Sequence, residues 1–137
     1  MPTVAVPLNL FKNFLADAYR GLHDFSDNDL AVALTNTEPD QAADSVIGDI
    51  TEIDYMYLSS RDINLLSEGL STSSYRVTSA PLTIHCYGGV SAAFQYSVIY
   101  KKSNGRLIGY SDYGATLMLG DGDSLKIQNS TYLLEHK

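Results

Sequence analysis

The chain has few of the residues on which many specialised small proteins depend. Its 137 residues include no tryptophan and a single cysteine, Cys86, so an intrachain disulfide is excluded. Lys and Arg number 9 against 16 Asp and Glu, and the net charge is -7. Nucleic-acid affinity rests largely on Lys and Arg displacing counterions, and anionic membranes attract basic segments. We therefore expect neither nucleic acid nor membrane as a partner.

Long apolar runs are also missing. No run approaches the length of a membrane span, and the apolar residues 1–10 lack the basic stretch of an export signal. The sequence thus predicts a soluble protein that is synthesised in the cytoplasm. Hydrophobic residues make up 45% and charged residues 18%, which is typical of a globular chain, and the length fits one domain.

The first residues are expected to form an extended arm. Pro2 and Pro7 fix φ and disfavour helix on their N-terminal side, which predicts an arm at 1–8 and a single β-rich domain at 9–137. Such an arm can add to the strand edge of a neighbouring protein, or it can fold back as a strand on its own domain. The apolar side chains that would contact a partner are Val4, Val6 and Leu8.

Apolar residues recur at helical spacing after the arm. They predict one amphipathic helix at 9–22, with Asn9 as its N-cap and Gly21 near its end. Residues 30–36, LAVALTN, form a short apolar run that predicts a buried strand. Residues 37–45 are expected to form an acidic loop. Residues 46–53 could form a strand or a helical turn, and residues 62–68 could form a helical turn or a strand edge.

From residue 74 onward, apolar and polar residues alternate with the period of two that marks half-buried strands. The predicted strands are 75–80, 82–87, 94–102 and 107–113. Asn104-Gly105 is a strong turn signal and should join the last two as a hairpin. A second hairpin is expected from 116–119 and 125–128. The pattern predicts a mainly β (α+β) fold, an antiparallel β-sandwich or small barrel with one N-terminal amphipathic helix.

No arrangement of residues indicates catalysis. His85 and Cys86 are neighbours on a predicted strand, so their side chains should point to opposite faces and cannot form a Cys–His pair. The sequence contains no G-x-S-x-G, phosphate-binding glycine loop or H-E-x-x-H motif. The run from Asp121 to Ser124 has the start of a calcium loop but not its later ligands, which favours a hairpin turn. We expect no enzyme activity, no cofactor and no metal.

Tyrosine is abundant, with ten residues. Four of them lie on the predicted hairpin: Tyr96, Tyr100, Tyr110 and Tyr113. Tyr96 and Tyr100 should share one face of the sheet. A cross-strand tyrosine cluster can stiffen a sheet, but tyrosine also favours contact surfaces, including those that bind saccharide. These four residues are therefore candidate partner contacts.

Several motifs follow one another in a recognisable order. They are LAVALTNTEP at 30–39, DITEI at 49–53, FQYSVIY at 94–100 and LIGYSDYG at 107–114. This order and spacing resembles a family of small tailed-bacteriophage virion structural proteins, which have VALTNTxP, DITEI and LIGYxDYG motifs. The resemblance covers roughly residues 10–128. It departs at 54–73, where that family has a glycine-rich turn.

The resemblance implies a head decoration, or cement, protein without enzyme activity. Such a protein would lie on the phage head surface and stabilise it by binding the major capsid protein and copies of itself. It would be a homo-oligomer, with a trimer possible, and many copies on a lattice would make weak contacts effective. One alternative is a tail or baseplate component that contacts host-surface carbohydrate. A third hypothesis is a small hydrolase that uses Asp49, Glu52 and Asp54 as acids and bases.

Overall fold

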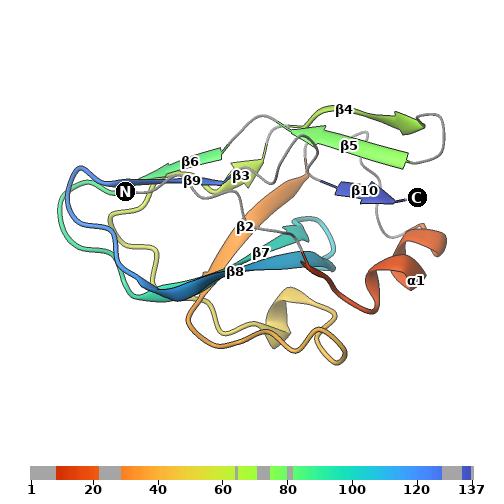
Figure 1. Ribbon diagram of the computed structural model, residues 1–137, viewed down its shortest axis with the longest axis horizontal. Helices are drawn as coiled ribbons and strands as arrows, with labels where there is room; N and C mark the ends of the chain where they lie inside the picture. Colours follow the sequence, from red (N-terminus) through yellow and green to blue (C-terminus); the bar gives the residue numbers. More distant parts are fainter. Residues whose placement is uncertain are drawn as a thin grey trace.

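A computed structural model describes residues 9–21, 29–63, 65–70, 75–79, 82–127 and 134–136. In this part of the chain the fold is mostly β, with antiparallel sheets and one short α-helix (Figure 1), as the sequence predicts. The described strands form layers like those of a sandwich, and they do not close into a barrel. The predicted arm, with Val4, Val6 and Leu8, lies outside the described residues.

Ten strands, one α-helix and one 3-10 helix are described. In chain order they are β1 (Asn9–Leu10), α1 (Phe14–Tyr19), β2 (Leu30–Thr35), η1 (Ile47–Asp49), β3 (Asp62–Ile63), β4 (Leu65–Leu70), β5 (Tyr75–Ser79), β6 (Leu82–His85), β7 (Phe94–Lys101), β8 (Leu107–Leu117), β9 (Ser124–Ile127) and β10 (Leu134–His136). The predicted strands at 30–36, 75–80, 82–87 and 94–102 are thereby confirmed to within two residues at each end.

The central layer is a sheet with the strand order β1-β8-β7-β2-β3. Strand β2 pairs along its whole length with β7, which pairs in turn with β8 across the predicted turn. Gly105 takes a φ of 72° there, the left-handed conformation that glycine adopts without steric cost. All six residues of β2 are buried, because apolar clusters cover both faces of the sheet at this strand. A continuous apolar run is the sequence pattern of such a strand.

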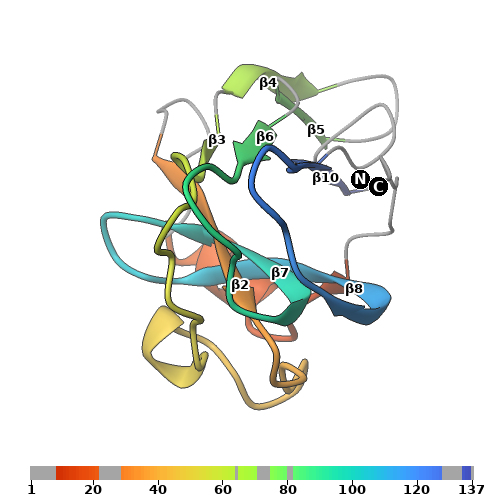
Figure 2. The ribbon, with the colours of Figure 1, turned by 90° about the vertical axis from the view of Figure 1, so that its left-hand side faces the viewer.

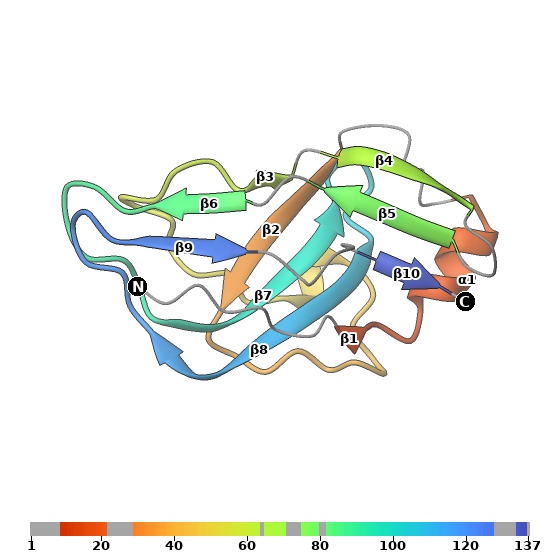
Figure 3. The ribbon, with the colours of Figure 1, turned by 45° about the horizontal axis from the view of Figure 1, so that its top comes forward.

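The second layer covers one face of this sheet. Strands β6 and β9 pair with each other, and β10, β5 and β4 form a further small sheet. β5 and β6 follow one another along one line, and so do β9 and β10 (Figure 3). Figure 2 shows β6 and β9 lying across from β2, β7 and β8. The main core fills the space between the layers and includes Leu30, Val32, Leu34, Ile84, Phe94, Ile99 and Leu125.

The predicted helix at 9–22 is wrong in its first part. Asn9 and Leu10 pair with Tyr110 and Gly109 of β8, so Asn9 is a strand residue and not an N-cap. The unpaired edge of β8 offers these two residues backbone hydrogen bonds, which local helical spacing cannot reveal. The helix begins at Phe14. Asp17 of this helix is buried, and its Oδ1 lies 3.9 Å from Nη1 of Arg106.

The predicted second hairpin is also wrong. Strand β8 continues through Leu117, and β9 pairs with β6 in the other layer, with Ile84 opposite Leu125. The turn at 120–123 exists, since the Asp123 amide donates to the Gly120 carbonyl over 3.0 Å. It leads from one layer to the other because Leu125 and Ile127 are buried in the main core. Within 62–68 the described residues are strand, in β3 (Asp62–Ile63) and the first part of β4 (Leu65–Leu70). Residues 46–53 contain both a helical turn, η1, and bridging residues at Val46 and Glu52.

Candidate functional site

The hairpin tyrosines do not form one exposed surface. Tyr96 and Tyr100 share a face of the sheet, as predicted, but Tyr96 is only 8% exposed. The ring of Tyr110 lies 5.4 Å from that of Phe11 and 6.4 Å from that of Tyr96. Tyr100 and Tyr110 pack against the second apolar cluster, which includes Phe11 and Ile50. Three of the four predicted contact tyrosines therefore stiffen this face of the sheet.

Tyr113 lies on the opposite face. Its ring meets Phe94 edge-on at 6.5 Å, and its hydroxyl is 3.0 Å from Oγ of Ser97. Tyr110 and Tyr113 are three residues apart on β8, so the alternation of side chains along a strand turns them to opposite faces. Burial raises the pKa of Tyr113, and it also raises the pKa of Tyr96 and Tyr110. A buried phenolate is disfavoured, so these tyrosines act as structural groups.

The acidic residues of 49–54 each bind a different part of the chain. Asp49 accepts hydrogen bonds from the Ser45 and Val46 amides, which hold its pKa below the usual value. Glu52 accepts from the Tyr55 hydroxyl over 2.7 Å. Asp54 accepts from the Met56 amide over 3.0 Å. Acid–base catalysis requires carboxylates that converge on one reacting group, and these three do not share a partner.

His85 and Cys86 point to opposite faces, as the sequence predicts. His85 is exposed, and its ring stacks on that of Tyr87 at 5.8 Å. Cys86 is buried, and its Sγ lies 3.3 Å from the Gly89 carbonyl oxygen and 3.5 Å from the Leu119 carbonyl oxygen, which share its single S–H proton. The thiol thus joins two loops within the core. Buried cysteines of this kind are structural and not reactive.

The turn at 120–123 uses its carboxylates locally. Asp123 accepts from the Gly120 amide over 2.9 Å, and Asp121 accepts from the Gly88 amide over 3.0 Å. Across the described ranges, no group of three His, Cys, Asp or Glu side chains is placed to hold a metal ion. This segment is a turn, as expected, and it ties the 86–91 loop to the 118–123 loop.

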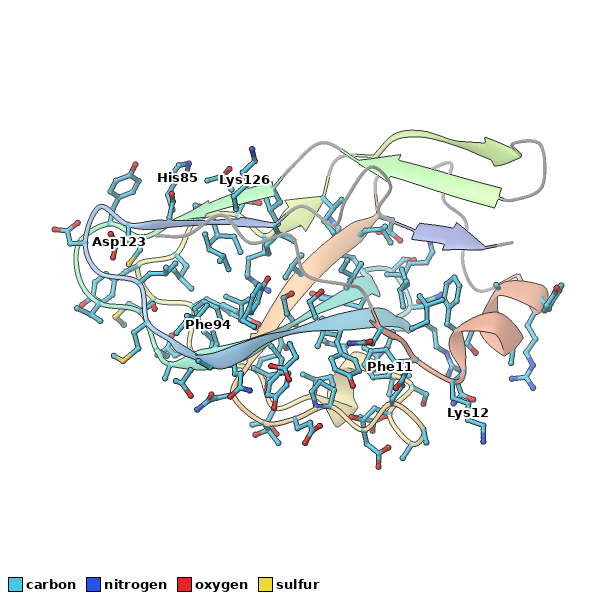
Figure 4. The ribbon with its side chains drawn as sticks, in the orientation of Figure 1. Phe11, Lys12, His85, Phe94, Asp123 and Lys126 are labelled. Atoms are coloured by element: carbon cyan, nitrogen blue, oxygen red, sulfur yellow. The ribbon has the colours of Figure 1, made fainter. Side chains whose placement is uncertain are left out.

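A group of exposed apolar side chains marks the loop end of the molecule. We call this group the apolar end; it consists of Met56, Tyr57, Tyr87, Val90 and Met118. Tyr57 is 43% and Tyr87 is 62% exposed. The three loops that carry these residues converge at the left-hand end, away from α1 (Figures 1 and 3). Figure 4 shows His85 and Asp123 at the same end. Exposed apolar residues on loops that converge at one end of a molecule are typical of an interaction site.

Backbone hydrogen bonds hold the three loops of the apolar end together. The Tyr87 amide donates to the Tyr57 carbonyl over 3.0 Å, and the Ser91 amide donates to the Leu119 carbonyl over 2.8 Å. Tyr57 has a φ of 72°, a conformation that is costly for a bulky residue. A Cβ on Gly89 would lie 2.6 Å from the Tyr57 ring, so this glycine is required for the ring to pack. Tyr57 therefore reaches the surface with a strained backbone conformation.

A pocket of about 410 Å³ is lined in part by residues 58–62, which follow the loop that carries Met56 and Tyr57. It opens on the central sheet where β7, β2 and β3 adjoin, and its lining includes Ala31, Tyr100, Lys102, Leu58, Arg61 and Asp62. The Lys102 ammonium lies 3.3 Å from Oδ1 of Asp62. The sequence had placed Tyr100 among its contact candidates, and the structure brings it to this pocket.

Backbone and side-chain groups together cover the edge of β2 beside the pocket. The Val32 amide donates to the Arg61 carbonyl over 2.9 Å, and the Ile53 amide donates to the Leu34 carbonyl over 3.0 Å. β3 pairs only with Leu30 and Ala31. Beyond them, Nη1 of Arg61 donates to the Val32 carbonyl over 2.8 Å, and the Leu34 amide donates to the Tyr55 hydroxyl over 3.0 Å. The Arg61 guanidinium stacks 3.5 Å from the Tyr55 ring centre. An unpaired strand edge invites pairing with another chain, and these backbone and side-chain contacts together occupy this edge.

No protein-family model, curated protein or solved structure matches the chain. The described part of the structure contains no helix that is long and apolar enough to cross a membrane. Sequence reasoning missed the apolar end, because its five residues lie in separate segments of the chain. The signal available was indirect: large apolar residues stand beside Gly88-Gly89 in a stretch that is otherwise typical of a loop.

Proposed function

We propose that this protein is a structural protein of a tailed-bacteriophage particle without enzyme activity, and that it decorates the head by binding the major capsid protein. The motif order from LAVALTNTEP to LIGYSDYG supports the virion assignment by resemblance. The mostly β fold is compatible with it. The observation that carries the binding role is the apolar end.

The apolar end has the properties of a preformed docking surface. Its loops are cross-linked by backbone hydrogen bonds, and the Cys86 thiol bonds two of them from beneath. A surface that is already ordered loses little conformational entropy when it binds. Large aromatic and Met side chains also supply most of the contact energy at protein interfaces.

Charge favours a different protein as the partner at this surface. Asp54 and Asp121 are exposed beside Met56 and Gly88, and the chain carries a net charge of -7. Two copies meeting through this end would bring like charges together. A capsid surface with an apolar centre and basic surroundings would complement it. Contact between copies, in a homo-oligomer such as a trimer, would then use another face.

The alternative is a tail or baseplate component that contacts host-surface carbohydrate through hairpin tyrosines. Tyr96 is buried, Tyr110 packs on Phe11 and Tyr113 packs on Phe94. Tyr100 lines the pocket beside β3. The positions of these tyrosines therefore support the carbohydrate-binding alternative less than their presence in the sequence did.

The first test locates the chain on the particle. Electron cryo-microscopy of the particle should show density of this fold at capsomer junctions on the head. Density confined to the tail would contradict head decoration and favour the tail alternative.

The second test measures binding of the purified chain to capsids that lack it. Tyr57→Gly removes the exposed ring and relieves the positive φ, so unfolding stability should change by no more than about 1 kcal/mol. Binding should weaken at least tenfold, or about 1.4 kcal/mol. Tyr19→Ser is the matched control, because Tyr19 is 86% exposed on α1. Unchanged binding of Tyr57→Gly, with the fold retained, would rule out the apolar end as the docking surface.

A further inference from the structure

The pocket beside β3 is shaped by Ala31, a small residue that lies between two larger ones in a row across the sheet. Tyr100 of β7 lies opposite Ala31 of β2, and Ala31 lies opposite Asp62 of β3. These three residues share one face, because partners in an antiparallel pair point to the same side. The methyl group of Ala31 leaves a gap between its larger neighbours. Leu58 and the residues that follow it form the remaining wall.

The charges around this pocket balance. Lys102 pairs with Asp62 at 3.3 Å, and Arg61 lies 3.8 Å from Glu52. An anionic ligand would meet the Asp62 carboxylate, and a cationic ligand would meet the Arg61 guanidinium and the Lys102 ammonium group. A neutral ligand avoids both repulsions. It can also use the donors of Arg61 and Lys102 together with the acceptor oxygens of Asp62.

The pocket also offers an apolar surface. Ala31, Leu58 and the ring of Tyr100 line it beside the charged groups. A sugar ring has the matching character, since hydroxyl groups at its edge donate and accept hydrogen bonds while its C–H groups pack on aromatic and aliphatic side chains. The volume of about 410 Å³ lies in the lower part of the range of about 300–1,000 Å³ for small-ligand sites.

The polar wall is fixed before any ligand arrives. The Arg61 guanidinium is held by the Val32 carbonyl at 2.8 Å and by stacking on Tyr55. Ser59 Oγ accepts from the His85 amide over 2.9 Å. Both contacts position the segment that precedes β3. A pre-ordered site loses less entropy on binding than a mobile one.

From this geometry we infer that the pocket binds one pyranose residue of a glycan. Ala31, Leu58 and Tyr100 receive the C–H face of the ring, and Asp62, Arg61 and Lys102 bond its hydroxyl groups. The inference goes beyond head decoration and does not depend on it, because the pocket and the apolar end are built from different side chains. A head-surface protein and a tail protein could each carry such a site.

The test is a titration of the isotope-labelled chain by NMR with glucose, galactose, mannose, N-acetylglucosamine and the α- and β-methyl glycosides of each. At least one methyl glycoside should shift the amide signals of 31, 58–62 and 100–102, with a dissociation constant of about 1 mM or lower. Shifts with a free sugar but with neither of its methyl glycosides would overturn the glycan assignment. The absence of shifts with every probe, or shifts confined to other residues, would overturn the site.

Two variants and a control complete the test. Asp62→Asn removes a carboxylate at an exposed position, and Ala31→Leu fills the floor of the pocket. Each should weaken glycoside binding tenfold or more. Asp112→Asn makes the same change as Asp62→Asn but on β8, two strands away from β2, and should leave binding unchanged. Asp62→Asn keeps the test decisive if Ala31→Leu fails to fold. Equal loss in Asp62→Asn and Asp112→Asn would overturn the assignment, as would no loss in Asp62→Asn.

Discussion

Tyr55 turns its hydroxyl to the edge of β2, whereas Tyr57, two residues later, leaves 43% of its surface in solvent. The Tyr55 hydroxyl accepts from the Leu34 amide and donates to Glu52. Tyr57 takes a strained φ of 72° and lays its ring over Gly89. The same residue type completes the sheet in one case and forms a surface in the other. The difference lies in the partners that the fold brings to each side chain.

The same contrast separates two larger regions. The β7–β8 hairpin turns Tyr96, Tyr110 and Tyr113 into apolar packing on the two faces of one sheet. The apolar end instead leaves Tyr87 62% exposed. A tyrosine-rich hairpin is thus a structural element here, and the surface suited to a partner lies in loops of ordinary composition. Residue type alone does not distinguish a contact surface from a core.

The largest expected effect tests whether the buried aromatic residues of the hairpin contribute more to the free energy of unfolding than the exposed residues of the apolar end. Phe94 is 0% exposed and contacts Tyr113, so Phe94→Ala should lower the free energy of unfolding by about 3–5 kcal/mol through lost burial and a cavity. Tyr87→Ala, at the apolar end, should lower it by no more than about 0.5 kcal/mol. Urea denaturation measures both. Equal losses would show that the apolar end belongs to the core.

An intermediate effect is expected from the pair Tyr55 and Tyr57. Tyr55→Phe removes the acceptor of the Leu34 amide, and a buried amide without a partner costs about 1–3 kcal/mol. Tyr57→Phe removes a hydroxyl at an exposed position and should leave stability unchanged. Thermal unfolding of the two variants against the parent gives the comparison. If Tyr55→Phe is neutral, the hydroxyl does not seal the edge of β2.

The smallest effect concerns alkaline pH. Burial raises the pKa of Tyr55, Tyr113, Tyr110 and Tyr96 above the ordinary tyrosine value of about 10. The unfolded chain therefore loses these protons first, so stability is intact below about pH 10 and falls as pH rises above it. Part of the phenolate absorbance should appear only above pH 10 and together with the loss of circular dichroism. Tyr113→Phe should reduce that late signal; an unchanged signal would contradict the burial of its hydroxyl.

Much of the fold could be predicted because its signals are local. The apolar run of β2, the alternation along β5, β6 and β7, and the Asn104-Gly105 turn each depend on neighbouring residues. The misplaced first part of the helix and the wrong second hairpin depend on distant ones. Asn9 and Leu10 become a strand because β8 lies beside them, and β9 joins β6 because Ile84 and Leu125 meet. Local spacing contains no information on either partner.

The candidate sites also divide into features that neighbouring residues predict and features that depend on residues far apart in the chain. His85 and Cys86 could be placed on opposite faces from strand geometry, and the 120–123 turn from its glycines. The pocket needs Ala31 between Tyr100 and Asp62, which requires the strand order β7-β2-β3. The apolar end needs three loops from separate parts of the chain to converge.

The sequence by itself determined that the chain builds short antiparallel strands around a buried LAVALT strand, because alternation and turn residues act over a few neighbours. Only the tertiary structure decided which tyrosines are covered, which edge of β2 is sealed and where apolar side chains stay in solvent. These outcomes depend on contacts between residues far apart in the chain. Burial is a property of the assembled layers, whereas strand formation begins in each segment.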